Sequence, residues 1–232
     1  MTCQTLAMPL SLHVPAVLKR PLPSGAHVRK LPLGGARGLA FTIDFDRHLR
    51  FYLGLYETEL RPWFARFATP GTVAYDIGAD VGYQALVIGR LTRSPVVAFE
   101  PRDDAASQIE RHSALNKDRV GPLQVVRAKV GRSSAPGETS LDDFQAQSPL
   151  EAPGLLLIDV DGGEVEVLAG ATRLFSETRP HLVIETHSPQ LERECRSILE
   201  QAGYQPMVVN NRRVFGDFRP LALNRWIAAK GR

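Results

Sequence analysis

The sequence predicts an α/β fold: a mostly parallel sheet with helices on both of its faces. Short, apolar, β-branched runs are typical of strands buried on both sides. Such runs occupy residues 73–77, 96–99, 155–158 and 181–184. Helical periodicity follows the first run, where apolar residues recur every three or four positions between residues 81 and 91. A chain of 232 residues with 44% apolar composition can enclose one large core, so we expect a single α/β domain.

A glycine-rich turn follows the first predicted strand. Gly78 and Gly82 lack a Cβ atom, so the turn can adopt backbone angles closed to other residues, and its main chain can approach a ligand closely. Glu100 lies 24 residues after Asp76, at the end of the neighbouring strand, where a carboxylate can bind both hydroxyls of a ribose. The pattern therefore predicts a nucleoside-binding βαβ unit.

The spacing of this turn favours S-adenosylmethionine over a dinucleotide. Pyrophosphate binding requires Gly-x-Gly-x-x-Gly, whereas this turn is Asp-x-Gly-x-x-x-Gly, with Ala79 and Asp80 near the position of the second glycine. The carboxylates of Asp76 and Asp80 would repel a pyrophosphate and attract the ammonium and sulfonium charges of the methyl donor. The alternatives are an NAD-type Rossmann oxidoreductase and a non-catalytic relative of the fold that binds a ligand or a partner protein.

Polar residues also follow the two later strands. Asp159 comes directly after residues 155–158, and Glu185 and His187 come after residues 181–184. Because the carboxyl ends of parallel strands meet at one edge of a sheet, these side chains are expected around one crevice. An alcohol is a poor nucleophile until it loses its proton, so a nearby base should accelerate transfer. Asp159, Glu185 and His187 are therefore the candidate catalytic residues, with Asp159 and His187 favoured as a pair.

A divalent metal is the rival interpretation of the same edge. Hard cations bind carboxylate oxygens, and a metal would acidify a bound hydroxyl. Because several acids at one edge often serve hydrogen bonding instead, we predict a site without a metal. The rival set of metal ligands is Asp159, Asp161, Glu164, Glu185 and His187.

From about residue 38 to the C-terminus, the chain resembles the FkbM-type methyltransferase family. The motifs that carry the resemblance are Tyr56-Glu57, Tyr75-Asp76-Ile77-Gly78-Ala79 with Gly82-Tyr83, Phe99-Glu100-Pro101, Asn116, Ser140-Leu141-Asp142, Ile158-Asp159-Val160-Asp161-Gly162, Val167-Leu168-Ala169-Gly170, Glu185 with His187, and Gly203-Tyr204. Two positions depart from the family pattern, because Asp80 stands where the family usually has Asn and Asp161 where it usually has Glu.

The resemblance implies a class I methyltransferase (Rossmann-like) fold, with a seven-stranded, mostly parallel sheet and a C-terminal antiparallel strand pair. It also implies methyl transfer from S-adenosylmethionine to a hydroxyl oxygen of a small molecule such as a saccharide or a secondary metabolite. The predicted cofactor-binding residues are Tyr56, Glu57, Asp76, Gly78, Ala79, Asp80, Gly82, Tyr83, Glu100, Pro101, Ala128 and Asp159.

The chain divides into two predicted parts. Residues 1–37, rich in proline and glycine, form a partly irregular N-terminal arm, and residues 38–232 form the FkbM-like domain. Within this domain, residues 38–70 provide lid elements and residues 71–232 the nucleoside-binding core. The remaining predicted elements are a strand at 41–45, a helix at 57–67, a helix from Pro189 to Gly203, and strands at 206–209 and 223–228.

Composition narrows the class of partner. The net charge is +3, but lysine and arginine are scattered and form no basic stripe for nucleic acid. No apolar run has the length of a membrane span, and Cys3 and Cys195 form neither a disulfide framework nor a zinc motif. We expect a cytoplasmic protein that acts on a small-molecule acceptor and binds neither nucleic acid nor membrane. The sequence pattern leaves the acceptor and the oligomeric state open.

Overall fold

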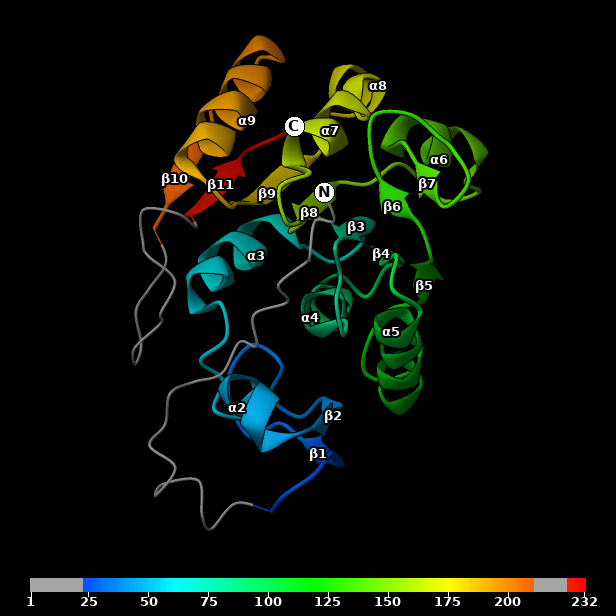
Figure 1. The fold of residues 1–232 in the computed structure, drawn as a ribbon, viewed down its shortest axis with the longest axis vertical. Helices are drawn as coiled ribbons and strands as arrows, with labels where there is room; N and C mark the ends of the chain where they lie inside the picture. Colours follow the sequence, from blue (N-terminus) through cyan, green and yellow to red (C-terminus); the bar gives the residue numbers. More distant parts are fainter. Residues whose placement is uncertain (1–22, 211–224) are drawn as a thin grey trace, which may run out of the picture.

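The computed structural model describes residues 23–210 and 225–232. Its centre is a seven-stranded sheet in the order β10-β11-β9-β8-β3-β4-β5 (Figure 1). The strands are β3 (Ala74–Ile77), β4 (Val96–Phe99), β5 (Leu123–Val126), β8 (Leu155–Ile158), β9 (His181–Thr186), β10 (Met207–Val209) and β11 (Arg225–Ala229). Neighbouring strands from β9 to β5 run parallel, and β11 runs antiparallel to both β9 and β10. The predicted fold class is therefore confirmed.

Helices cover both faces of this sheet (Figure 1). On one face lie α3 (Arg61–Phe67), α4 (Tyr83–Thr92) and α5 (Asp103–Leu115), and α2 (Phe45–Tyr52) belongs to the same core. The other face carries α6 (Leu141–Gln147), α7 (Glu164–Ala169), α8 (Thr172–Glu177) and α9 (Pro189–Gln201). Successive strand residues alternate between the two cores: Ala74 faces the first and Tyr75 the second. Both faces are buried, which explains the continuous apolar runs in the sequence.

Local capping explains where several helices begin. The Ser188 side chain accepts a hydrogen bond from the Leu191 N–H, and Pro189 occupies the first turn of α9. Ser140 caps α6 in the same way by accepting from the Asp143 N–H.

The structure corrects three predicted boundaries. The strand expected at 41–45 is β2 (Ala40–Ile43), because Asp44 caps α2 by accepting from the Asp46 N–H. The helix expected at 57–67 is divided into η1 (Thr58–Leu60) and α3, and Glu57 has a left-handed backbone with φ of 41°. Strand β9 continues to Thr186, so Glu185 lies within the strand and not beyond it.

Other elements were not predicted. Residues of the expected N-terminal arm form β1 (His27–Lys30), which pairs with β2 in an antiparallel ribbon. A second small pair, β6 (Lys129–Val130) and β7 (Glu138–Thr139), lies between β5 and α6 in the sequence. The predictions for residues 1–22, including Cys3, and for residues 223 and 224 lie outside the described residues.

Candidate active site

The glycine turn between β3 and α4 is shaped by its packing against neighbouring elements. Gly78, Asp80 and Gly82 all have positive φ, at 85°, 46° and 81°. A Cβ atom on Gly78 would lie 1.9 Å from the Asp159 carbonyl oxygen, and one on Gly82 would lie 3.0 Å from the Ile109 side chain in α5. Neighbouring residues therefore occupy the space that a Cβ atom would need at both positions, so packing requires glycine there.

A partly open cavity lies beside this turn. It is lined by Phe51, Tyr56, Glu57, Asp76, Gly78, Ala79, Asp80, Val81, Tyr83, Gln84, Leu157, Asp159 and Trp226. Most of the predicted cofactor-binding residues are among them. Gly82, Glu100, Pro101 and Ala128, which were also predicted to bind the cofactor, are not: Gly82 packs against α5, Glu100 and Pro101 follow β4, and Ala128 follows β5.

Two buried polar atoms on the cavity walls have no hydrogen-bond partner among the described residues. They are Oδ2 of Asp76 and Nε1 of Trp226. Burial of polar atoms without partners costs free energy, so such atoms in a cavity wall are typical of groups that bind a ligand. One acceptor and one donor are thus available to a polar cofactor.

Burial also changes the charge of Asp76. The pKa of Asp76 is raised from 3.8 to about 7, chiefly by desolvation and also by the nearby carboxylates of Glu100 and Asp80, against the opposing effect of a hydrogen bond with the backbone of Ala85. A cationic ligand in the cavity would favour the ionised form. The charge of Asp76 is therefore coupled to occupancy of the cavity.

Aromatic rings form another wall of the cavity. Phe51 lies 4.6 Å from Tyr56 and 4.5 Å from Tyr83, measured between ring centroids, and the two tyrosine rings are 5.1 Å apart. Beside them, Oε2 of buried Glu57 accepts a hydrogen bond from the Gln84 side chain at 2.6 Å. Burial, followed by the nearby Glu57 charge, raises the pKa of Tyr56, so its hydroxyl stays protonated and can donate a hydrogen bond.

Glu100 holds the glycine turn. Its Oε2 accepts from the Asp80 backbone N–H at 2.9 Å, and its Oε1 accepts from the backbone N–H and from Nε–H of Arg102, both at 3.0 Å. Arg102 also pairs with the Asp80 carboxylate at 2.5 Å. In this Asp80–Glu100–Arg102 clasp, Arg102 compensates the charge of Asp80. Asp80 should therefore attract a sulfonium less strongly than the sequence suggested. Arg102 was not among the predicted site residues, although an acid at a position where the family has Asn was a signal for a basic partner.

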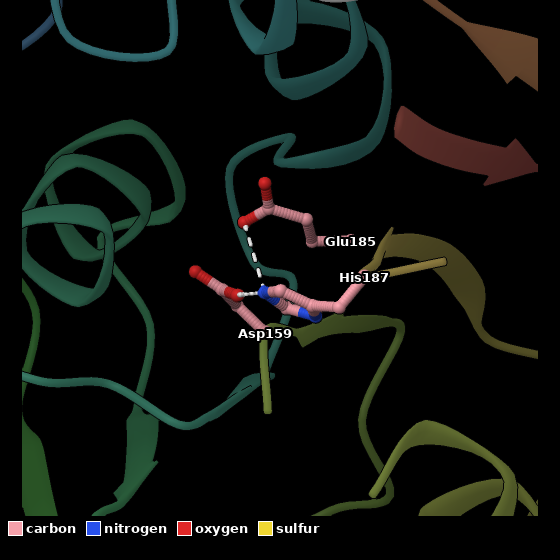
Figure 2. Close-up of side chains that lie close together, drawn as sticks. All are labelled: Asp159, Glu185 and His187. Carbon is pink, nitrogen blue, oxygen red and sulfur yellow. Dashed lines mark ion pairs between the residues drawn. The ribbon is translucent and has the colours of Figure 1, made fainter. Parts of the chain in front are cut away.

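The candidate catalytic residues meet at the carboxyl ends of β8 and β9 (Figure 2). Nε2 of His187 lies 3.6 Å from Oδ1 of Asp159 and 4.0 Å from Oε2 of Glu185. Exposed Asp161 approaches the same nitrogen, at 3.3 Å. The prediction that these three catalytic candidates lie together is thus matched by their positions, and Asp159 also lines the cavity.

The other ring nitrogen of His187, Nδ1, contacts Glu164. Nδ1 lies 2.5 Å from Oε1 of Glu164, which is completely buried in the first turn of α7. Burial lowers the pKa of His187, but the hydrogen bond with Glu164 and the charges of Glu185, Glu164 and Asp161 outweigh it and raise the pKa. Glu164 was predicted only as a rival metal ligand, and its contact with the histidine was not predicted.

The chain is similar to known methyltransferases in sequence. Residues 101–206 match the profile of the methyltransferase FkbM domain, a range that contains Asp159, Glu185 and His187. The hexuronic acid methyltransferase AglP of Haloferax volcanii is 24% identical over 156 residues, which cover 56% of this chain and 62% of that protein.

Solved structures share the fold. FkbM methyltransferase from Methylobacillus flagellatus has a TM-score of 0.54 at 18% identity, covering 78% of this chain and 52% of that protein. TYW2 of M. jannaschii, in complex with AdoMet, has a TM-score of 0.54 at 12% identity, covering 89% and 86%. These identities show the fold alone.

The chain spans less than two thirds of the AglP sequence and about half of the Methylobacillus protein. Among the described residues, no helix is long and apolar enough to cross a membrane. The sheet topology and the profile match confirm that this chain has the class I methyltransferase fold and resembles the FkbM-type methyltransferases, as its motifs predicted.

Proposed function

We propose that this chain transfers a methyl group from S-adenosylmethionine to a hydroxyl oxygen of a saccharide. One observation carries the proposal: the cavity beside the glycine turn reaches Asp159, which also belongs to the cluster at the ends of β8 and β9. A donor site and a proton-accepting site would thus share one residue. The similarity to a hexuronic acid methyltransferase supports a saccharide as acceptor.

The lining residues suit the cofactor by their chemistry. Ionised Asp76 would attract a cationic group of S-adenosylmethionine, and the aromatic rings of Tyr56 and Tyr83 would provide an apolar wall. Glu100 would fix the glycine turn and offer its carboxylate to the ribose. When bound, the cofactor supplies an electrophilic methyl carbon, so the chain has to align the acceptor and exclude water.

The acceptor hydroxyl must lose its proton during transfer. Nε2 of His187 and the Asp159 carboxylate face each other at 3.6 Å and are the proposed proton acceptors. Glu164 orients the imidazole by binding Nδ1, while Glu185 holds a negative charge close to the ring and would stabilise the imidazolium. We therefore assign proton acceptance to His187 with Asp159, and positioning to Glu164 and Glu185.

Mass spectrometry with a methyl donor carrying a deuterated methyl group tests the function. The chain is incubated with a panel of neutral saccharides and uronic acids, and fragmentation of any labelled product distinguishes a methyl ether from a methyl ester or a methylated amine. We expect a labelled ether that disappears with Asp159→Asn and persists with Glu166→Gln, an exposed acid paired with Arg132. Labelled product on nitrogen, or no labelled saccharide although the donor binds, would contradict the proposed acceptor class.

A further inference from the structure

We propose that Asp159, Glu185 and His187 form a binding site for a divalent cation such as Mn²⁺ or Mg²⁺. The site lies at the carboxyl ends of β8 and β9, next to the cavity that Asp159 helps to line. The chemical role of the cation rests on the proposed function, whereas its binding does not. The proposal departs from the sequence prediction of a site without a metal.

The separations of the donor atoms suit a shared ion. One ligand atom from each of the three residues lies within 4.8 Å of the others. Nε2 of His187 is 3.6 Å from the Asp159 oxygen and 4.0 Å from the Glu185 oxygen, distances too long for direct hydrogen bonds. Ligands bound to one cation at about 2.0–2.3 Å are themselves separated by about 2.8–4.6 Å. Figure 2 shows both carboxylates pointing toward the same ring nitrogen.

The imidazole is oriented as a metal ligand would be. Histidines that bind metals usually donate their second ring N–H to a carboxylate, which fixes both the tautomer and the direction of the coordinating nitrogen. Oε1 of buried Glu164 lies 2.5 Å from Nδ1 of His187, so a proton on Nδ1 leaves the lone pair of Nε2 directed toward Asp159 and Glu185. The other Glu164 oxygen, Oε2, is buried and has no hydrogen-bond partner among the described residues.

The charge around His187 also favours a cation. Four carboxyl groups, from Asp159, Asp161, Glu164 and Glu185, have an oxygen within 4.0 Å of its ring nitrogens. A protonated imidazole brings them one positive charge, whereas a divalent ion brings two and binds carboxylate oxygens directly. One nitrogen and two carboxylates, with no thiolate, favour Mn²⁺ or Mg²⁺ over ions that prefer sulfur ligands.

Such an ion would assist methyl transfer by binding the acceptor hydroxyl. The bound hydroxyl is more acidic and releases its proton to water. A lone pair of the resulting alkoxide forms the bond to the methyl carbon as the carbon–sulfur bond breaks, and that electron pair returns to sulfur. His187 would then bind the ion and would not need to accept the proton itself.

Manganese binding tests the site directly. Protein stripped with EDTA and dialysed is titrated with Mn²⁺, and the free ion is followed by electron paramagnetic resonance. We expect one Mn²⁺ per chain, displaced by excess Mg²⁺. Asp159→Asn and His187→Ala should each weaken binding at least about tenfold, and Glu164→Gln should weaken it by about 10-fold through the loosened imidazole. Glu166→Gln, on the same helix as Glu164 but paired with exposed Arg132, should bind like the parent.

Circular dichroism tests whether each variant is folded. If His187→Ala does not fold, the isosteric Asp159→Asn variant provides the test. Absence of Mn²⁺ binding at millimolar concentration, or equal affinity in the parent and a folded Asp159→Asn variant, would overturn the metal site. S-adenosylmethionine binding is measured on the same samples. If the protein binds the methyl donor but not Mn²⁺, the proposed function stands and the metal site is wrong. If it binds Mn²⁺ but not the methyl donor, the metal site stands and the proposed function is wrong.

Discussion

The acids at the two halves of the sheet edge are arranged differently. After β4, Glu100 accepts three N–H hydrogen bonds, and Arg102 compensates both Glu100 and Asp80. After β8 and within β9, Asp159 and Glu185 face His187 at distances longer than hydrogen bonds. The first half is a scaffold that fixes the backbone, and the second half brings one ligand atom each of Asp159, Glu185 and His187 within 4.8 Å of one another. Position at a strand end alone therefore does not show whether an acid binds a ligand or shapes the turn.

We expect the largest effect from a substitution in the glycine turn, which belongs to the scaffold half. Gly78→Ala adds a Cβ that would meet the Asp159 carbonyl oxygen, in a backbone with positive φ. We expect the free energy of unfolding to fall by roughly 2–5 kcal/mol, the sum of overpacking and left-handed strain. The matched control is Gly162→Ala, which has a similar φ of 87° but no atom within 4 Å of its Cβ position, and should lose only about 1–2 kcal/mol. Denaturant unfolding measures both, and equal losses would show that the contact with Asp159 is unimportant.

The next prediction addresses the ligand-facing half. His187→Ala should slow methyl transfer about 100-fold, because the hydroxyl loses either its base or the residue that holds its cation. Affinity for S-adenosylmethionine should hardly change, since His187 does not line the cavity. Steady-state rates and calorimetry separate the two effects, with exposed His27→Ala as control. A variant as fast as the parent would reduce His187 to a structural residue.

Glu100 has two proposed roles, because it fixes the glycine turn and would also bind the ribose of the cofactor. Glu100→Ala should weaken S-adenosylmethionine binding by roughly 1.5–3 kcal/mol, through loss of a charged hydrogen-bond acceptor. Arg102→Met removes the partner of Glu100 and leaves its carboxylate, so it should weaken binding less. If calorimetry gives both variants the same loss, Glu100 acts only through the clasp, and our assignment of Glu100 to the ribose is wrong.

Regular patterns made most of the sheet predictable. The strands β3, β4, β8 and the start of β9 are continuous apolar runs, and α9 has both a serine cap and an initial proline. Strand β5 at the sheet edge was overlooked because it is only partly buried and its pattern is weak. The end of β9 was misjudged because polar Glu185 and Thr186 are buried within the strand, opposite Trp226 and Arg225 of β11.

The site was predictable in its residue types but not in its contacts. Acids at strand ends indicated the edge where Asp76 and Asp159 lie. Which acid accepts hydrogen bonds from the backbone depends on tertiary packing, so the clasp formed by Glu100 with Asp80 and Arg102 had no signal in the spacing. The orientation of His187 by Glu164 had none either, because the two residues are 23 positions apart on different elements.

The smallest predicted effect concerns the pH dependence of cofactor binding. The pKa of Asp76 is raised to about 7, so the carboxyl is largely protonated below that pH. A cationic cofactor prefers the ionised form, and its affinity should therefore rise with pH up to about 7 and level off above it, by at most about tenfold per pH unit. In the empty protein the sign is opposite: stability contributed by neutral Asp76 is lost as pH rises from 3.8 through about 7.

Calorimetry from pH 5.5 to 8.5 and urea unfolding of the empty protein measure these two trends. Asp76→Asn should flatten both, and the exposed Asp46→Asn is the control. If Asp76→Asn kept the full pH dependence, another group would be responsible for it.

We propose that the cavity between the glycine turn and Asp159 binds a sulfonium nucleoside. Calorimetric titration of the full chain with S-adenosylmethionine and, separately, with NAD tests it most directly. We expect saturable binding of one S-adenosylmethionine per chain and no saturable heat with NAD. Saturable binding of NAD without binding of S-adenosylmethionine would contradict it.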